Sequence, residues 1–253
     1  MHLIIVVFFL KVLPLTVVGN HFDNHSAIHL GLKVETGLLQ EKKLKVVAFG
    51  NSITATRKTI RQVYAQRLPK ILAKSGLTAE VINAGVPGSH TGSVSDHSLF
   101  KIQHGRDRIN SDVLAHHPDL VIVGFGTNDA HIDGEDPEGP SRIPVKDYEM
   151  NLTSMIRKFQ ENGIKIILLA PNPLGDKFPD YQNDRLILYV NTVRALSRKY
   201  QTGLVDNFKL FMEYPKNAGI PMDDLLLDGI HPNDLGHQLI AGALGNEIIR
   251  IIN

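Results

Sequence analysis

One serine and one aspartate–histidine pair have the types and settings that nucleophilic chemistry needs. Ser52 lies in the segment GNSIT of residues 50–54, directly after an apolar run, where a strand is expected to turn into a helix. Asp228 precedes His231 by three residues, just before the last amphipathic stretch. In a loop, this spacing lets the carboxylate hold one ring nitrogen of the histidine while the other nitrogen faces a reactant. A serine hydroxyl within reach of that nitrogen would be a nucleophile.

Each of these residues also has an ordinary structural interpretation. Ser52 could cap the next helix or lie in a simple turn. Asp228 and His231 could be a surface pair or half of a metal site. A metal site is disfavoured because the other histidines form no recognisable ligand set with this pair; they include His90, His97, His104, His116 and His117. The chain also lacks the G-x-S-x-G elbow of ordinary α/β-hydrolases and the GKS or GKT loop of nucleotide-binding proteins.

Two further turns could supply hydrogen-bond donors to a developing negative charge. Residues 83–89, NAGVPGS, follow the second apolar run, and glycine there lets a backbone N–H approach a substrate oxygen. Residues 124–129, GFGTND, follow the third run, and Asn128 could present its side-chain amide. Either stretch alone is an ordinary turn. Their occurrence together with the serine and the Asp–His pair, each just after a core element, predicts an acyl-transfer site.

The elements that must position these residues alternate along the chain. The strand candidates show little polar alternation, as expected of parallel strands covered on both faces; they are residues 44–49, 80–83, 120–125, 165–169 and 204–205. Helical spacing of apolar residues falls within residues 60–72, 145–159 and 235–249, and Pro69 should kink or divide the first of these helices. The alternation predicts a doubly wound α/β sheet, with ligands beyond the carboxyl ends of the strands.

Composition excludes several classes of function. The length of 253 residues and the 43% apolar content fit one domain better than two. Lys and Arg total 27 against 26 Asp and Glu, so no net charge attracts polyanions, and we expect no nucleic-acid partner. The chain has no cysteine, which excludes disulfides, a cysteine nucleophile and thiolate metal sites.

The stretches FGNSIT, NAGVPG, GTND and DGIHP resemble, in this order, the four sequence blocks of the SGNH or GDSL hydrolases. The resemblance implies a catalytic triad of Ser52, His231 and Asp228. It implies an oxyanion hole formed by Ser52, Gly88 and Asn128. It also implies a three-layer α/β/α, flavodoxin-like fold with a five-stranded parallel sheet, and no metal or organic cofactor.

The chain departs from the family pattern at one position. The first block of the family usually reads GDS, and this chain has Asn51. That aspartate is not the triad acid, and an asparagine can still hydrogen-bond the nearby backbone, so we expect an active site. Three segments resemble a branch of small-ester esterases similar to isoamyl acetate hydrolases: GTNDA, residues 143–151 and residues 170–174. Exported bacterial carbohydrate acetylesterases are close relatives of that branch.

The resemblance implies a serine esterase that hydrolyses short-chain O-esters, acetyl esters foremost, on carbohydrates or other small alcohols, through an acyl-serine intermediate. Residues 88–104 and 133–141 are long polar connections that suggest an open, polar rim, which favours short acyl groups on sugars. The alternatives are a lysophospholipase or thioesterase that acts on lipid esters, and a catalytically impaired carbohydrate-binding module. Acyl transfer to another alcohol would use the same triad.

The N-terminus differs in composition from the rest of the chain. Residues 3–10 are wholly apolar, Lys11 interrupts, and a second apolar stretch runs to Gly19. This pattern predicts a signal peptide over residues 1–19, and hence a secreted or periplasmic protein with no stable membrane span after processing. The alternatives are an uncleaved anchor and a buried strand. The anchor is disfavoured because the stretch, with Lys11 inside it, is short for the roughly 20 residues that span a bilayer. We then expect an N-terminal extension over 20–42 and a single hydrolase domain over 43–253.

Overall fold

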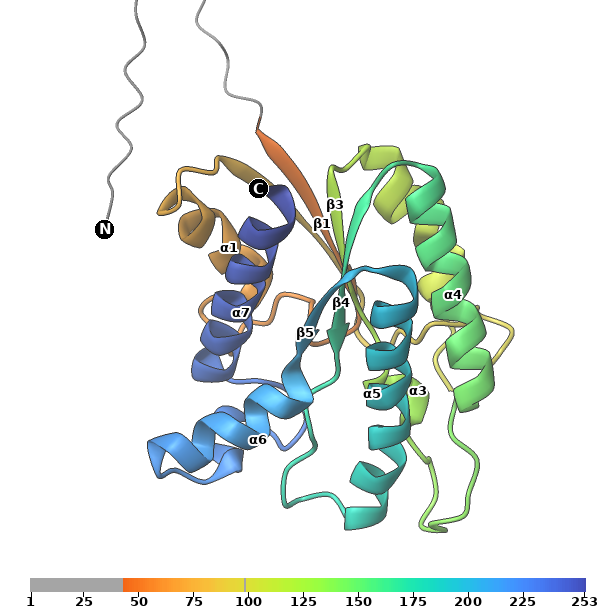
Figure 1. The fold of residues 1–253 in the computed structure, drawn as a ribbon. Helices are drawn as coiled ribbons and strands as arrows, with labels where there is room; N and C mark the ends of the chain where they lie inside the picture. Colours follow the sequence, from red (N-terminus) through yellow and green to blue (C-terminus); the bar gives the residue numbers. More distant parts are fainter. Residues whose placement is uncertain (1–42, 98) are drawn as a thin grey trace, which may run out of the picture. The chain divides into compact units, whose positions relative to one another are not determined.

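The computed structural model describes residues 43–97 and 99–253 (Figure 1). The predicted signal peptide over residues 1–19 and the extension over residues 20–42 lie outside the described residues. Within the described ranges, no helix combines the length and the apolar character needed to cross a membrane.

Five parallel strands form one sheet, in the order β2-β1-β3-β4-β5. The strands are β1 (Leu44–Gly50), β2 (Ala79–Gly85), β3 (Leu120–Gly124), β4 (Lys165–Ala170) and β5 (Gly203–Asp206). Every residue of β3 is buried, as are most residues of β1 and β4, so these strands are covered on both faces. The predicted α/β fold with a five-stranded parallel sheet is confirmed.

Helices cover both faces of the sheet (Figure 1). One core holds buried residues of α1 (Tyr64–Ala73), α6 (Asn207–Ala218) and α7 (Asp234–Ile252). The other core holds buried residues of α4 (Val145–Glu161) and α5 (Asp180–Tyr200). Short helical segments complete the described chain: α2 (Gly105–Arg108), η1 (Ile109–Val113), η2 (Leu114–His116), α3 (Thr127–Ala130) and η3 (Met222–Leu225).

The first helix differs from its prediction. It begins at Tyr64, where the side chain of Gln66 accepts a hydrogen bond of 2.9 Å from the N–H of Val63. Pro69 does not divide this helix, because α1 continues through it to Ala73. The other expectation, a kink at Pro69, stays a prediction. Leu68 and Leu72, on either side of the proline, are fully buried. Packing of this apolar face outweighs the one hydrogen bond that proline removes.

Three glycines lie side by side at the carboxyl ends of the neighbouring strands β2, β1 and β3. Gly50 of β1 is in register with Gly85 of β2 and with Gly124 of β3. A Cβ atom at Gly50 would lie 2.6 Å from the carbonyl oxygen of Gly124, and one at Gly85 would lie 2.2 Å from the backbone nitrogen of Ala55. The backbone that follows β1 therefore folds directly over these strand ends, and side chains larger than hydrogen would displace it.

Candidate active site

The turn after β1 carries Ser52 and is held by its neighbour Asn51. The Asn51 side chain is buried, and its Oδ1 accepts a hydrogen bond of 2.9 Å from the N–H of Ile53. The backbone carbonyl oxygen of Asn51 accepts hydrogen bonds of 3.1 Å from the N–H groups of Thr54 and Ala55. The expectation that an asparagine here hydrogen-bonds the nearby backbone is confirmed.

The loop before α7 brings a histidine and a carboxylate to this serine. Ser52 Oγ lies 2.9 Å from His231 Nε2, and His231 Nδ1 lies 2.7 Å from Asp228 Oδ2. Asp228 Oδ1 also accepts from the backbone N–H groups of His231, at 2.9 Å, and Ile230, at 3.2 Å. The carboxylate thus requires a proton on Nδ1, which leaves Nε2 to accept from the serine hydroxyl.

Electrostatics favour the same arrangement of charge. Burial alone would raise the pKa of Asp228, but the hydrogen bonds from the backbone and ring of His231 bring it below its ordinary value. Burial lowers the pKa of His231, against the opposing effect of Asp228, and the positive charge of Arg57 lowers it further. At neutral pH the imidazole is therefore an uncharged base beside an ionised carboxylate.

The turn after β2 places Gly88 in a conformation that suits glycine. Its φ of 78° lies in the left-handed region. A Cβ atom there would lie 3.2 Å from the ring of Phe100, so the position is also crowded. The turn is tied to the end of β1, because the N–H of Val86 donates to the carbonyl oxygen of Gly50 at 3.1 Å.

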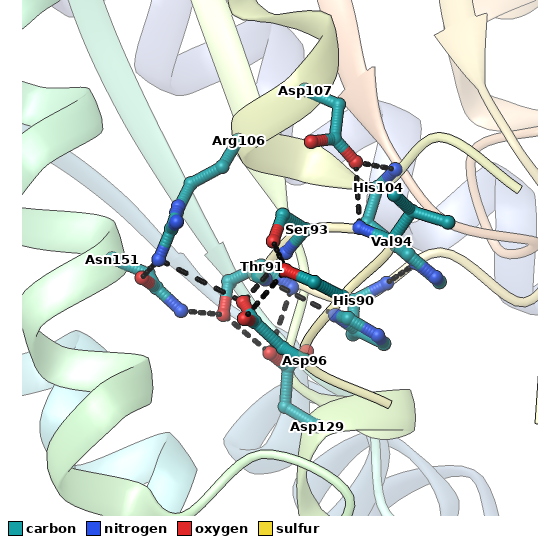
Figure 2. A network of polar contacts seen from close by, with 12 residues as sticks. His90, Thr91, Ser93, Val94, Asp96, His104, Arg106, Asp107, Asp129 and Asn151 are labelled. Carbon is teal, nitrogen blue, oxygen red and sulfur yellow. Dashed lines mark hydrogen bonds and ion pairs between the residues drawn. The ribbon is translucent and has the colours of Figure 1, made fainter. Parts of the chain in front are cut away.

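The turn after β3 presents Asn128 to the same loop. Asn128 Nδ2 donates to the carbonyl oxygen of Ser89 at 2.9 Å, which uses one of its two hydrogens. The next residue, Asp129, is fully buried, and Figure 2 shows its carboxylate beside Thr91. It accepts from the N–H of Thr91 at 2.8 Å, from the Thr91 hydroxyl, and from the N–H of Gly126 at 3.0 Å. Asp129 therefore clamps the turn that carries Asn128 to the loop that follows Gly88.

The sequence pattern of the GDSL-like lipase/acylhydrolase family matches residues 48–239 of the chain. The chain belongs to this family. It is therefore a carboxylic ester hydrolase. The family match spans the stretches that contain Ser52, Gly88, Asn128, Asp228 and His231.

Known proteins of this kind resemble the hydrolase over most of its length. A lipase/acylhydrolase from Enterococcus faecalis is 27% identical, with a TM-score of 0.65 over 81% of this chain and 95% of that chain. An acetyl xylan esterase, AlAXEase, is 26% identical, with a TM-score of 0.64 over 80% of this chain and 98% of that chain. The uncharacterized lipoprotein YqeF of Bacillus subtilis is 29% identical over 204 residues, which are 72% of this chain and 77% of that protein.

Arg108 is a buried residue that the sequence motifs did not indicate. It holds the ends of β1 and β2 together in the hydrolase. Arg108 donates to the carbonyl oxygens of Ala84, at 3.0 Å, and Gly50, at 3.1 Å, and to Ser89 Oγ at 3.2 Å. Its guanidinium carbon lies 4.8 Å from the centre of the Phe49 ring. No motif surrounds this arginine in the sequence. Two of its four hydrogen-bond partners among the described residues are backbone carbonyl groups, which every residue carries, and the other two are Ser89 and Asp112. For Asp129, by contrast, the signal was its place directly after Asn128.

Two of the other histidines are buried beside the Gly88 turn. The rings of His90 and His104 stack with their centres 3.5 Å apart. Burial lowers the pKa of His90 to about 3, so the ring is neutral, and its Nδ1 accepts from the N–H of Gly92 at 3.1 Å. Over the described part of the chain, no group of three or more His, Asp or Glu side chains is arranged to hold a metal ion.

Proposed function

We propose that this hydrolase is a serine esterase that removes short acyl groups, acetyl foremost, from carbohydrates or other small alcohols. The observation that carries the proposal is the hydrogen-bonded series from Ser52 Oγ through the ring of His231 to Asp228. A serine hydroxyl is a weak nucleophile at neutral pH, and an adjacent oriented imidazole is the group that activates it.

In the proposed reaction, His231 takes the Ser52 proton as Oγ attacks the ester carbonyl carbon, and Asp228 stabilises the imidazolium that forms. The imidazolium then gives this proton to the departing alcohol, which leaves an acyl-serine. Water, deprotonated by the same imidazole, releases the acid and restores the serine.

The negative charge on the carbonyl oxygen needs donors that are fixed before the reaction begins. We assign this role to the backbone N–H groups of Ser52 and Gly88 and to the side-chain amide of Asn128. The hydrogen bond from Asn128 to Ser89 supports the assignment, because it holds the amide in place and leaves one hydrogen for the oxyanion.

The exposure of the site supports a polymeric or bulky alcohol as the leaving group. The side chain of Asp228 is 44% exposed and that of His231 is 16% exposed. A sugar chain could therefore approach from solvent without entering a deep channel. The likeness to the acetyl xylan esterase AlAXEase points to the same substrate class.

Exposed apolar side chains favour lipid esters as the second candidate. Val94 and Leu99, in the loop that follows the Gly88 turn, are 50% and 53% exposed, and Leu227, next to Asp228, is 42% exposed. Apolar residues around a catalytic site would suit an acyl chain or a lipid surface.

A panel of acetylated glycans and p-nitrophenyl esters of increasing acyl length tests the proposal, run on the wild type and on Ser52→Ala. We expect the highest kcat/KM for acetyl esters and acetylated sugars, and no turnover by the variant. A preference for long acyl chains would instead establish the lipid-ester function.

We also propose that the protein is exported, from the apolar residues 3–10 and from the likeness to a bacterial lipoprotein. Expression of the full chain, followed by N-terminal sequencing of the extracytoplasmic fraction, tests this. A protein retained in the cytoplasm with Met1 intact would contradict it.

A further inference from the structure

A small cavity, lined by both polar and apolar residues, lies behind the turn that carries the serine. Its volume is about 10 Å³, close to the lower limit for one water molecule. Five polar side chains line it: Asn51 and Thr54 after β1, Thr127 at the start of α3, Asn172 after β4, and Asn207 at the start of α6. The Thr54 hydroxyl already has a partner, the hydroxyl of Tyr64 at 2.8 Å. The cavity therefore lies where the turn after β1, which carries Ser52, meets the turn after β3, which carries Asn128, and the ends of β4 and β5. We call the first the nucleophile turn and the second the oxyanion turn.

Three buried oxygen atoms on these side chains have no hydrogen-bond partner in the protein. They are Thr127 Oγ1, Asn172 Oδ1 and Asn207 Oδ1. Buried polar atoms in folded proteins are almost always hydrogen-bonded to protein or to ordered water. The three residues that carry these atoms line one cavity of this size, which indicates a common partner.

The orientation of Asn172 fixes what that partner must supply. Its Nδ2 donates to the carbonyl oxygens of Pro173, at 2.9 Å, and Ile230, at 3.0 Å. Rotating the amide would set its oxygen against these two carbonyl oxygens, so Oδ1 remains an acceptor at the cavity. The partner must therefore donate hydrogen bonds to carbonyl oxygens and be no larger than water.

We propose that one buried water molecule occupies this cavity and positions the catalytic turns relative to one another. The water donates to Asn172 Oδ1 and Asn207 Oδ1 and accepts from the hydroxyl of Thr127. Since Thr127 precedes Asn128, and Asn172 also holds the carbonyl of Ile230, the water joins the oxyanion turn to the His231 loop. Thr127 and Asn172 are thus positioning residues.

The same cavity accounts for asparagine at position 51. Asn51 Oδ1 accepts from the N–H of Ile53, so the amino group is the part of this side chain left for the cavity. The Asn51 amino group is a hydrogen-bond donor, so it is compatible with the acceptor oxygens Asn172 Oδ1 and Asn207 Oδ1. An aspartate would add a negative charge beside Asn172 Oδ1 and Asn207 Oδ1, which is unfavourable in a buried site.

The direct test is a crystal structure of the purified protein at a resolution that shows ordered water. We expect density for one water molecule within hydrogen-bond distance of Thr127 Oγ1, Asn172 Oδ1 and Asn207 Oδ1. A cavity without density, or one closed by rotated side chains, would overturn the proposal. This measurement does not depend on the reaction that the enzyme performs.

The kinetic test rests on the proposed esterase function and uses Thr127→Val, which keeps the side-chain volume and removes the hydroxyl. We expect kcat to fall on the order of 10-fold to 100-fold with KM unchanged, because small displacements in a site have effects of this size. Thr127→Ser, which keeps the hydroxyl, should restore kcat. Full kcat in Thr127→Val would overturn the positioning role, whereas absence of activity in the wild type would contradict the proposed function.

Ser197→Ala is the matched control for the loss of one buried hydroxyl. Ser197 is buried in α5, and its hydroxyl donates to the carbonyl oxygen of Thr202 at 3.1 Å, remote from the cavity. We expect this variant to lower Tm without changing kcat. If it lowers kcat as much as Thr127→Val does, the effect is general destabilisation and the positioning role is wrong.

Asn51→Asp tests the charge argument. We expect kcat and Tm to fall further below the wild type at pH 8 than at pH 5, because an ionised carboxylate at the cavity is disfavoured. A variant that equals the wild type at both pH values would show that the cavity does not select asparagine.

Discussion

At the scale of single residues, the proposed oxyanion site depends on one amide that is already held in place. Asn128→Ala removes this donor without altering a buried apolar contact. We expect turnover to fall on the order of 100 to 1,000-fold, as for other oxyanion donors, with the far-UV circular dichroism spectrum unchanged. Asn110→Ala, at an exposed position, is the control and should leave turnover intact. Full activity in Asn128→Ala would remove this residue from the mechanism.

The buried carboxylate of Asp129 makes stability depend on pH. Burial raises its pKa from 3.8 to about 6, against the hydrogen bonds that it accepts. The folded state therefore favours the protonated form, and the stability contributed by that form is lost as pH rises from about 4 to about 6. This shift corresponds to about 3 kcal/mol at most.

Asp129→Asn removes this titration. We expect its free energy of unfolding, relative to that of the wild type, to be higher at pH 7 than at pH 4, so that the variant is relatively more stable at pH 7. Urea denaturation measures this difference. We also expect a lower kcat, since an amide cannot accept all the hydrogen bonds from Thr91 and Gly126. A difference in stability that does not change with pH would show that Asp129 does not titrate in this range.

The pKa of His231, the proposed general base, determines where kcat/KM falls on the acid side of its pH profile. Burial lowers the pKa of His231 below its ordinary value of 6.5. The neutral imidazole is the active form, so activity is lost as pH falls through this lowered pKa. We expect the acid limb of kcat/KM for p-nitrophenyl acetate to have its midpoint below pH 6.5. A midpoint above that value would contradict the environment described for this ring.

At the scale of elements, the carboxyl ends of the adjacent strands β1 and β2 leave no room for a side chain. Gly85→Ala would place Cβ 2.2 Å from the backbone nitrogen of Ala55, in the turn that follows Ser52. We expect both Tm and kcat to fall. Gly242→Ala is the control, because a Cβ there meets nothing within 4 Å in α7 and should stabilise the helix by about 0.5–1 kcal/mol. A tolerated Gly85→Ala would show that the turn can move away without loss.

The sequence predicted the elements that carry a plain apolar signal. Most strands were found because their residues are mainly apolar, and α4 and α7 because their apolar residues recur with helical spacing. The 21-residue helix α5 was not predicted. Its buried residues, such as Tyr189 and Val193, are accompanied by the exposed Leu188, so the apolar stripe has no clear edge in the sequence.

At the scale of the whole molecule, parallel strands bring distant segments together at the carboxyl end of the sheet. Ser52 and His231 are 179 positions apart and share a hydrogen bond of 2.9 Å. The motifs made this contact predictable. The contacts of Arg108 and Asn172 with backbone carbonyl groups were not predictable, because every residue carries such a group. A sequence shows which side chains are present, but the strand register and turns decide which carbonyl groups lie within reach of them.

The central claim is that Ser52 is the nucleophile and is activated by His231. Labelling with a fluorophosphonate probe, followed by peptide mapping, tests it most directly. We expect the wild type to be modified at Ser52, Ser52→Ala to remain unlabelled, and His231→Ala to label far more slowly while retaining its fold. Modification at another residue, or unchanged labelling of Ser52→Ala, would contradict the account.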